Sequence, residues 1–139
     1  MDKEYKHAEI TDLIIKGFYS VYNSLGYGFL EKVYLKALVL ELRKLGLEVV
    51  EQALINVYYL DQIVGEYYAD LLVNKRVIVE VKAVQILADE HEAQLLNYLK
   101  ATPYEIGLLL NLGSAPQTKR KAFSNDRKAN LAWTLKAVT

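Results

Sequence analysis

The most constraining feature of this sequence is the apolar run Tyr104–Leu112. A strand that is apolar on both faces must be covered on both sides, as strands are in sheets that carry helices on each face. Asp89 and Glu92 form a candidate capping pair for a helix that runs from there to about Ala101. A further strand is expected at 76–84, before this helix. The order strand, helix, buried strand predicts a parallel pair joined by a right-handed crossover.

Two helices and more strands are expected before this unit. Apolar residues recur at three- and four-residue spacing over 10–25 and over 29–45, and a glycine follows each stretch as a C-terminal cap. Stretches rich in Val, Ile and Tyr then predict strands at 47–52, 54–60 and 63–73. The expected order is α-α-β-β-β-β-α-β. The predicted fold class is therefore α/β (α+β), a mixed β-sheet flanked by helices.

The composition is typical of one globular domain. The chain has 139 residues, 53% of them hydrophobic, and a chain of this size buries roughly 70% of its unfolded surface. The absence of cysteine excludes a disulfide framework, a thiolate metal site and a thiol nucleophile. No apolar run is long enough to span a membrane and the first residues are not a signal peptide, so a cytoplasmic protein is expected. We expect one domain at 1–124 and a basic extension at 125–139.

Charged residues in apolar strands are the main functional signal. The period of two puts Glu80 and Lys82 on one face of strand 76–84 and three valines on the other. Asp70 also lies among apolar neighbours, in the preceding strand. A two-residue turn between the two strands would place Asp70 opposite Val79, facing away from Glu80, whereas a three-residue loop at 74–76 places it opposite Glu80.

We expect the three-residue loop, because only this register separates polar from apolar side chains. It gathers Asp70, Glu80 and Lys82 on one face, with Tyr68 opposite Lys82. The other face is then wholly apolar, with the pairs Val73–Val77, Leu71–Val79 and Ala69–Val81.

Two carboxylates and an ammonium on one sheet face have a chemical use. Paired carboxylates bind a hard cation such as Mg²⁺, which acidifies a bound water and neutralises charge on a phosphate. A lysine can orient that water or stabilise the developing oxyanion. The simpler interpretation, a wet strand face with a Glu–Lys pair, has equal weight on this strand alone. Without cysteine, any metal must be held by oxygen, which favours Mg²⁺ or Mn²⁺ over structural zinc.

Two further motifs accompany these residues. A G-x-x-E-x-x-Y motif at 28–34 opens the second expected helix, and a Q-x-x-x-Y motif at 94–98 lies on the third. Together with the Asp…Glu-x-Lys set they resemble the PD-(D/E)XK nuclease superfamily over about residues 8–113, and within it the GxxExxY family. The Q-x-x-x-Y element is similar to that of RecB-like nucleases. Ala69, not proline, precedes Asp70, which departs from the pattern of the superfamily.

The resemblance implies a restriction-endonuclease-like fold and a metal-dependent nuclease. Asp70 and Glu80 match the metal-binding acids, and Lys82 matches the catalytic lysine. Glu31 matches a helix glutamate beside the metal, so the implied metal ligands are Asp70, Glu80 and Glu31. A glutamate in a first helical turn is also favourable to the helix dipole without any catalytic role.

The remaining motif residues have two interpretations each. Gln94 and Tyr98 match positions that steady the site and the nucleic-acid backbone, and their spacing puts them on one helical face, where a tyrosine also packs. Gly28 is either part of the motif or a flexible helix entry, and Tyr34 is either part of it or core. His91 shares the face of Gln94 and is interpreted as a surface residue. The eleven tyrosines of the chain are interpreted mostly as strand and core residues rather than as a stacking platform.

The net charge of zero hides an uneven distribution. Residues 1–112 hold 11 basic and 16 acidic side chains, whereas residues 113–139 hold six basic side chains against one acid. Several acids of the first part are the implied metal ligands, whose charge a cation would offset. The basic end could contact phosphates, but a solvated and partly disordered end is the favoured interpretation.

Three functions remain open. The first is a metal-dependent nuclease that hydrolyses phosphodiester bonds, with DNA expected as partner rather than RNA. The second is a nucleic-acid-binding or assembly module on the same fold with weak or lost catalysis. The third is a structural or toxin-like interaction protein whose acids form salt bridges. No membrane partner is expected, and the oligomeric state, a homodimer included, is left open.

Overall fold

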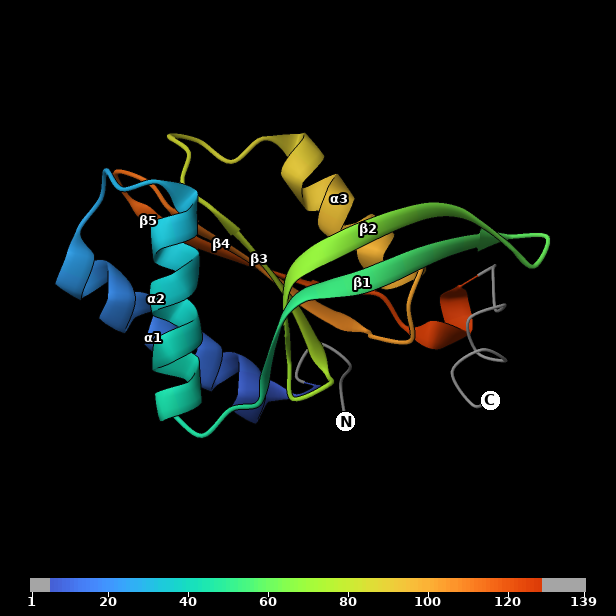
Figure 1. The fold of residues 1–139 in the computed structure, drawn as a ribbon, viewed down its shortest axis with the longest axis horizontal. Helices are drawn as coiled ribbons and strands as arrows, with labels where there is room; N and C mark the ends of the chain where they lie inside the picture. The colour runs from blue at the N-terminus through green and yellow to red at the C-terminus, as the bar shows by residue number, and fades with distance from the viewer. Residues whose placement is uncertain (1–5, 129–139) are drawn as a thin grey trace.

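The computed structural model describes residues 6–128, which form a five-stranded sheet with helices on both of its faces (Figure 1). The strands follow the order β1-β2-β3-β4-β5, with β3 and β4 parallel and the other neighbouring pairs antiparallel. This confirms the predicted fold class and the predicted parallel pair. The elements are, in chain order, α1 (Ala8–Leu25), α2 (Glu31–Lys44), β1 (Val49–Tyr59), β2 (Gln62–Val73), β3 (Val77–Lys82), α3 (Asp89–Lys100), β4 (Ile106–Leu112), β5 (Pro116–Ala122) and the 3-10 helix η2 (Asn125–Arg127).

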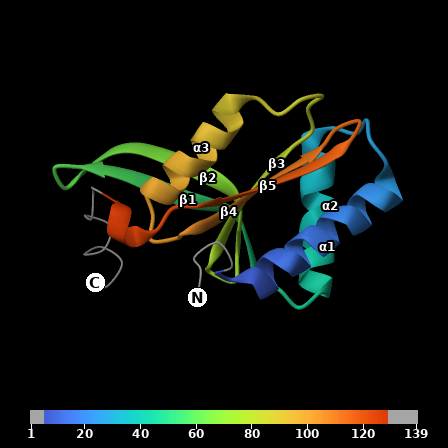
Figure 2. The same ribbon diagram turned by 180° about the vertical axis from the view of Figure 1, so that it is seen from behind.

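Strand β4 is buried on both faces, as predicted, and every one of its seven residues is buried. Alternate side chains of β4 enter two separate apolar clusters. Leu108 and Leu110 join the cluster formed with α1 and α2, whereas Leu109 joins Leu95 and Leu99 of α3. The sheet therefore separates α1 and α2 from α3, an arrangement that Figure 2 shows from behind.

The observed order of elements is α-α-β-β-β-α-β-β, which differs from the expected order in two places. The stretches expected as separate strands at 47–52 and 54–60 form one strand, β1. The backbone bends between them, since Gln52 has a φ of 52°, but the pairing with β2 continues on both sides. A further strand, β5, then follows β4.

The interpretation of 113–139 as a solvated end is wrong for residues 116–122. They form β5, which pairs with β4 over its full length. A strand at the edge of a sheet tolerates charged side chains. Because three basic residues follow one another in this segment, it lacks the apolar pattern that predicts a strand. Residues 129–139, which hold Lys136 and most of the expected extension, lie outside the described residues. No helix within residues 6–128 is long and apolar enough to cross a membrane.

Strand β2 changes its packing partner at Asp70. Leu71 packs with the cluster of α1 and α2, and Leu72 packs with α3, as alternation requires. Ala69 should share the face of Leu71, but it packs with α3 instead. The ladder between β2 and β3 ends at the pair Leu71–Val79. Beyond this point, β2 turns away from β3 and remains paired with β1 alone.

The distal parts of β1 and β2 form a two-stranded arm that projects from the body of the sheet (Figure 1). The arm begins at the pair Ala53–Ala69 and ends at Tyr59–Gln62. Ala53, Ile55 and Ala69 on one face of the arm pack with the cluster of α3. The arm therefore lies alongside α3 and encloses space between them.

Candidate active site

Asp70 and Glu80 lie side by side where β2 leaves β3, and each accepts a hydrogen bond from the other strand. The backbone N–H of Asp70 donates to Oε2 of Glu80 at 2.7 Å, and the N–H of Val81 donates to Oδ2 of Asp70 at 2.8 Å. Within residues 6–128, the other carboxylate oxygens, Oδ1 and Oε1, accept no hydrogen bond. The two carboxylates are thus fixed by one oxygen each, and the second oxygen remains available.

The expected three-residue loop is confirmed, since the ladder pairs Val73 with Val77, Leu72 with Ile78 and Leu71 with Val79. Two pairs expected further along are wrong. Ala69 and Val81 lie in different apolar clusters, and Tyr68 pairs with Leu54 of β1 rather than facing Lys82 in a ladder. Both differences arise from the bend of β2 at Asp70.

Burial makes the acid pair costly to ionise. Glu80 is only 4% exposed, and its burial, together with the nearby Asp70 carboxylate, raises its pKa to about 8. Burial also raises the pKa of Asp70, although the hydrogen bond from Val81 and the charge of Lys82 oppose that shift. The pair therefore holds a proton near neutral pH unless a cation compensates its charge.

Lys82 lies close enough to influence all the acids of the site. Its positive charge lowers the pKa of Asp70, of Glu80 and of Glu31, against the larger effect of their burial. No ion pair between Lys82 and an acid occurs in the part of the chain that the structure describes. The salt-bridge interpretation of these residues therefore has no support here.

Glu31 is the first residue of α2, and its side chain reaches the same region while remaining exposed. Burial of its carboxylate raises its pKa, and the charge of Asp70 adds to this, whereas Lys82 and His91 lower it. Electrostatic influence of this kind requires proximity. The structure thus brings the four residues expected as the catalytic set to one place.

The G-x-x-E-x-x-Y motif positions Glu31 through its other two residues. Gly28 has a φ of 115°, a conformation that L residues rarely adopt. Tyr34 is fully buried, and its hydroxyl donates to the carbonyl of Gly26 at 2.6 Å and accepts from the N–H of Phe29 at 3.2 Å. These contacts hold the loop that leads into α2 and thereby fix where the helix begins.

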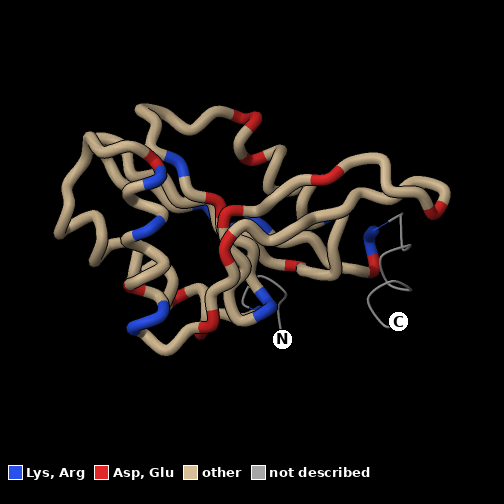
Figure 3. Tube along the Cα trace, in the orientation of Figure 1, with Lys and Arg blue, Asp and Glu red and all other residues tan. Residues whose placement is uncertain are grey.

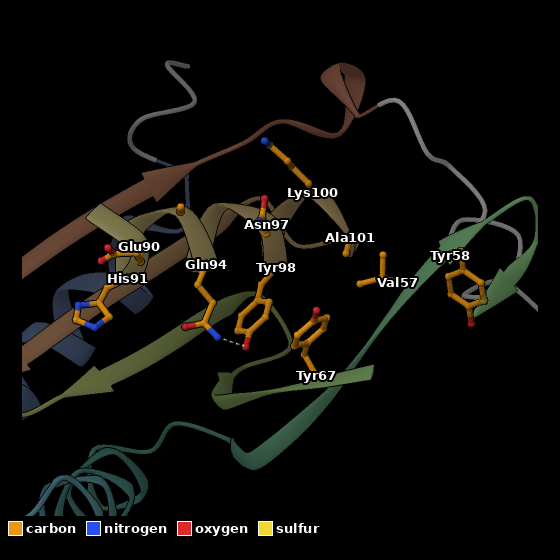
Figure 4. Close-up of a pocket in the computed structure, with 11 residues that line it drawn as sticks. Val57, Tyr58, Tyr67, Glu90, His91, Gln94, Asn97, Tyr98, Lys100 and Ala101 are labelled. Atoms are coloured by element: carbon orange, nitrogen blue, oxygen red, sulfur yellow. Dashed lines mark hydrogen bonds between the residues drawn. The ribbon is translucent and has the colours of Figure 1, made fainter. Parts of the chain in front are cut away.

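Gln94 and Tyr98 lie on the face of α3 that is turned toward the acids. Nε2 of Gln94 donates to the Tyr98 hydroxyl at 2.8 Å (Figure 4). Burial raises the pKa of Tyr98, and the charges of Glu80 and Asp70 raise it further. The Tyr98 hydroxyl is therefore close to the acid pair, as the motif implied.

His91 differs from its expected role as a surface residue. It caps α3, because its Nδ1 accepts a hydrogen bond from the N–H of Ala88 at 3.1 Å. This replaces the expected capping pair of Asp89 and Glu92, since the helix begins one residue earlier than that pair requires. His91 also lowers the pKa of Glu31, so it belongs to the surroundings of the site.

Asn111 is a residue of the site region that sequence reasoning missed. It is fully buried in β4, beside Lys82 in the parallel ladder. Its Oδ1 accepts from the N–H of Val84 at 2.9 Å and its Nδ2 donates to the Val84 carbonyl at 2.8 Å. A buried amide in an apolar strand is the signal that would have revealed it. Asn111 fixes the chain just after Lys82.

The basic residues of β5 are already paired with other parts of the molecule. Lys119 and Lys121 both bond to Glu92 of α3, at 3.1 and 2.6 Å, and Arg120 donates to the carbonyl of Lys6. Acidic positions instead gather where the arm leaves the sheet (Figure 3). The centre of the molecule is thus acidic, with Lys82 as a nearby positive charge.

The acid pair suits a hard divalent cation. Oδ1 of Asp70 and Oε1 of Glu80 are oxygen donors. Burial, and after it the charge of Asp70, raises the pKa of Glu80, and a cation would favour its ionised form. Residues 6–128 contain no cluster of three or more Asp, Glu, His or Cys side chains that could hold a metal. Glu31, the third ligand that the resemblance implies, lies beside the pair. A pair is sufficient for Mg²⁺, which commonly keeps water in its other positions.

Comparisons with known proteins support one family. The solved structure described as "Crystal structure of SSO0001" is similar, with a TM-score of 0.35 and 14% identity over 91% of this chain and 74% of that one, a likeness too low to carry an argument. No curated protein sequence matches the chain. The family model for the PD-(D/E)XK nuclease superfamily matches residues 8–123, which is most of the chain. The protein therefore belongs to the PD-(D/E)XK nuclease superfamily.

Proposed function

We propose that this protein is a metal-dependent nuclease of the GxxExxY family that hydrolyses phosphodiester bonds of nucleic acid, with DNA as the expected substrate. The observation that carries the proposal is the interlocked pair of Asp70 and Glu80, each fixed by one oxygen and each with a second oxygen available. Membership of the superfamily supports the reaction class. The Asp70–Glu80 pair with Lys82 and Glu31 beside it supports the site.

In this proposal Asp70 and Glu80 hold Mg²⁺ or Mn²⁺, with Glu31 beside them. When bound, the cation supplies Lewis acidity toward a phosphate oxygen and lowers the pKa of a coordinated water. Glu80, whose pKa burial and the Asp70 charge raise to about 8, would hold such a cation as the carboxylate, because the charge of the cation would offset both effects. The backbone N–H groups of Asp70 and Val81 keep both carboxylates in place without reorganisation.

Lys82 and the residues of α3 complete the proposed mechanism. The ammonium of Lys82 makes no ion pair within residues 6–128 and is free to orient the attacking water or to stabilise charge that develops on the phosphate. Gln94 holds the hydroxyl of Tyr98 beside the acids, where it can donate to a phosphate oxygen. Each of these roles requires only groups that already face the site.

The test measures cleavage of labelled single-stranded and duplex DNA and RNA by purified full-length protein with Mg²⁺, with Mn²⁺ and with EDTA. We expect metal-dependent cleavage that falls by at least about 100-fold in Glu80→Gln and Lys82→Met proteins, because each removes a charge used in the transition state. Glu66→Gln, at an exposed position on β2, is the matched control and should cleave normally. Absence of cleavage of every substrate with both metals would overturn the proposal.

A second function is a nucleic-acid-binding module with weak catalysis. It keeps the fold and the family membership of the first proposal and differs from it only in turnover. The same assay separates the two, because a binding module would show affinity that falls steeply with salt but no turnover.

A further inference from the structure

A pocket of about 740 Å³ lies between the arm and α3, next to the candidate active site (Figure 4). This volume is within the range of ligand-binding pockets in proteins, roughly 300–1,000 Å³. The acids of the site are not part of its lining, but Tyr98 is, and Tyr98 is close to Glu80 and Asp70. The pocket is lined by Val57 and Tyr58 of β1, by Tyr67 of β2, and by residues of α3 and its end that include Gln94, Asn97 and Tyr98.

Two tyrosine rings lie together in this pocket. The ring of Tyr67 lies 5.9 Å from that of Tyr98, at an angle of 47°. Tyr98 is only 5% exposed, whereas Tyr67 is 49% exposed, so one aromatic residue supports another that remains accessible. Both rings point into the pocket in Figure 4. An accessible ring held in place by a buried one is a stacking surface whose orientation is already fixed.

The pocket also carries amide groups suited to an uncharged heterocycle. Gln94 and Asn97 line it with side chains that both donate and accept hydrogen bonds. The charged residues Glu90 and Lys100 lie at opposite ends of α3, Glu90 in its first turn and Lys100 in its last. A planar ligand with donors and acceptors on its edges matches this combination of apolar faces and amides.

The charge of the arm argues against a ligand held there by its phosphates. Residues 45–74 contain five acidic side chains and no lysine or arginine. Glu66 pairs with Asn56 in the ladder, so alternation turns it away from the face of Val57 and Tyr67. The arm therefore offers stacking without positive charge, while Lys82 lies near the acids of the site and Lys100 lines the pocket.

We propose that this pocket binds an unstacked nucleobase of a single-stranded nucleic acid, stacked on Tyr67, so that the adjoining phosphate reaches the Asp70–Glu80 pair. The inference rests on the proposed function and adds a substrate class to it. A base within a duplex is paired and stacked, and must be extruded at a cost before it can enter such a pocket. Single strands are therefore preferred over duplexes of the same sequence.

The experiment measures the affinity of the full-length protein for a labelled single-stranded oligodeoxynucleotide by fluorescence anisotropy, in EDTA so that no cleavage occurs. We expect Tyr67→Ala to weaken binding about 5- to 150-fold, the effect of losing one base–aromatic stack, and Tyr67→Phe to bind normally. Tyr68→Ala is the matched control, because Tyr68 is equally exposed, at 55%, but faces away from the pocket. With an oligonucleotide of abasic sites, the wild-type and Tyr67→Ala proteins should bind equally.

Equal affinities of the wild-type, Tyr67→Ala and Tyr68→Ala proteins for the single strand would overturn the inference, as would tighter binding to the duplex. An equal loss in both alanine variants would also overturn it, because it would indicate general damage to the arm. Cleavage measured in parallel tests the proposed function separately. Normal cleavage together with no effect of Tyr67→Ala on binding would refute only the proposed base pocket. Base-dependent binding without cleavage would refute only the proposed nuclease activity.

Discussion

The substitution Glu80→Gln should make the metal-free protein more stable, and increasingly so as the pH rises. Glu80 is buried beside Asp70, and its pKa is raised from 4.5 to about 8. In the unfolded chain the same carboxyl ionises near pH 4.5. Between these two pH values the folded state holds a proton that the unfolded state has released, so the unfolding free energy falls as the pH rises. Glutamine has nearly the same shape, still accepts the hydrogen bond from Asp70 and does not ionise.

The magnitude follows from the two pKa values. Linkage between them gives a loss of about 1 kcal/mol at pH 5, about 3 kcal/mol at pH 7 and about 4 kcal/mol at pH 8, relative to low pH. These losses are absent from the glutamine protein. The difference in unfolding free energy between the two proteins should therefore grow by about 3 kcal/mol from pH 5 to pH 8.

Urea unfolding followed by circular dichroism in EDTA, at pH 5, 6, 7 and 8, measures this difference. The exposed substitution Glu66→Gln is the control and should give no growing difference from the wild type. Repeating the series with Mg²⁺ adds a second readout, because a ligand that binds only the folded state stabilises it. The wild type should gain more from Mg²⁺ than the glutamine protein does. A difference between the two proteins that does not change with pH in EDTA would refute the reasoning.

Two smaller predictions concern residues that position the site. Tyr34→Phe removes the hydroxyl that bonds to Gly26 and Phe29, so it should lower the unfolding free energy by about 1–3 kcal/mol in urea and reduce cleavage by mispositioning Glu31. Asn111→Leu has a similar volume but leaves the N–H and carbonyl of Val84 without their partner, so it should cost about 2–4 kcal/mol in the same assay. A normal unfolding midpoint in either protein would contradict the role given to its hydrogen bonds.

The larger features of the fold could be predicted from the sequence because they follow from hydrophobic periodicity. The helices at 10–25 and 29–45 correspond to α1 and α2, and the apolar run Tyr104–Leu112 corresponds to the buried strand β4. The parallel arrangement of β3 and β4 follows from the length of the connection between them, which is too long for a hairpin. These features depend on which residues are buried, and the pattern of apolar residues in the sequence indicates those residues.

Edge strands and bends within strands are harder to predict from the sequence. Strand β5 carries Lys119, Arg120 and Lys121 in succession, and a pairing partner on one side suffices to form it without an apolar pattern. The break expected near Ala53 is a bend within β1, where Gln52 adopts a left-handed conformation. The amino-acid composition of these two segments therefore does not distinguish the edge strand β5, or the continuous strand at Gln52, from a loop.

The residues of the candidate site that could be predicted from the sequence are the charged ones that lie among apolar neighbours. Asp70, Glu80 and Lys82 interrupt apolar strands, and the register that joins them follows from the separation of polar and apolar faces. Tyr67 does not stand out, because tyrosine is common in strands. Tyr67 lies in strand β2, as the interpretation of most tyrosines as strand and core residues expects, but its accessibility of 49% depends on the direction of the arm.

The bend of β2 at Asp70 explains why the acid pair and the pocket occur together. The ladder between β2 and β3 stops at Leu71 and Val79, and the N–H groups of Asp70 and Val81 then bond to carboxylate oxygens instead. These two donors stabilise the very charges that burial disfavours. The same bend turns the arm over α3 and encloses the pocket. Replacing either acid by alanine would therefore leave an N–H group without its acceptor, so that a loss of structure would accompany the loss of charge. Glutamine and asparagine keep the acceptor, and only they separate the chemical role of the two acids from their structural one.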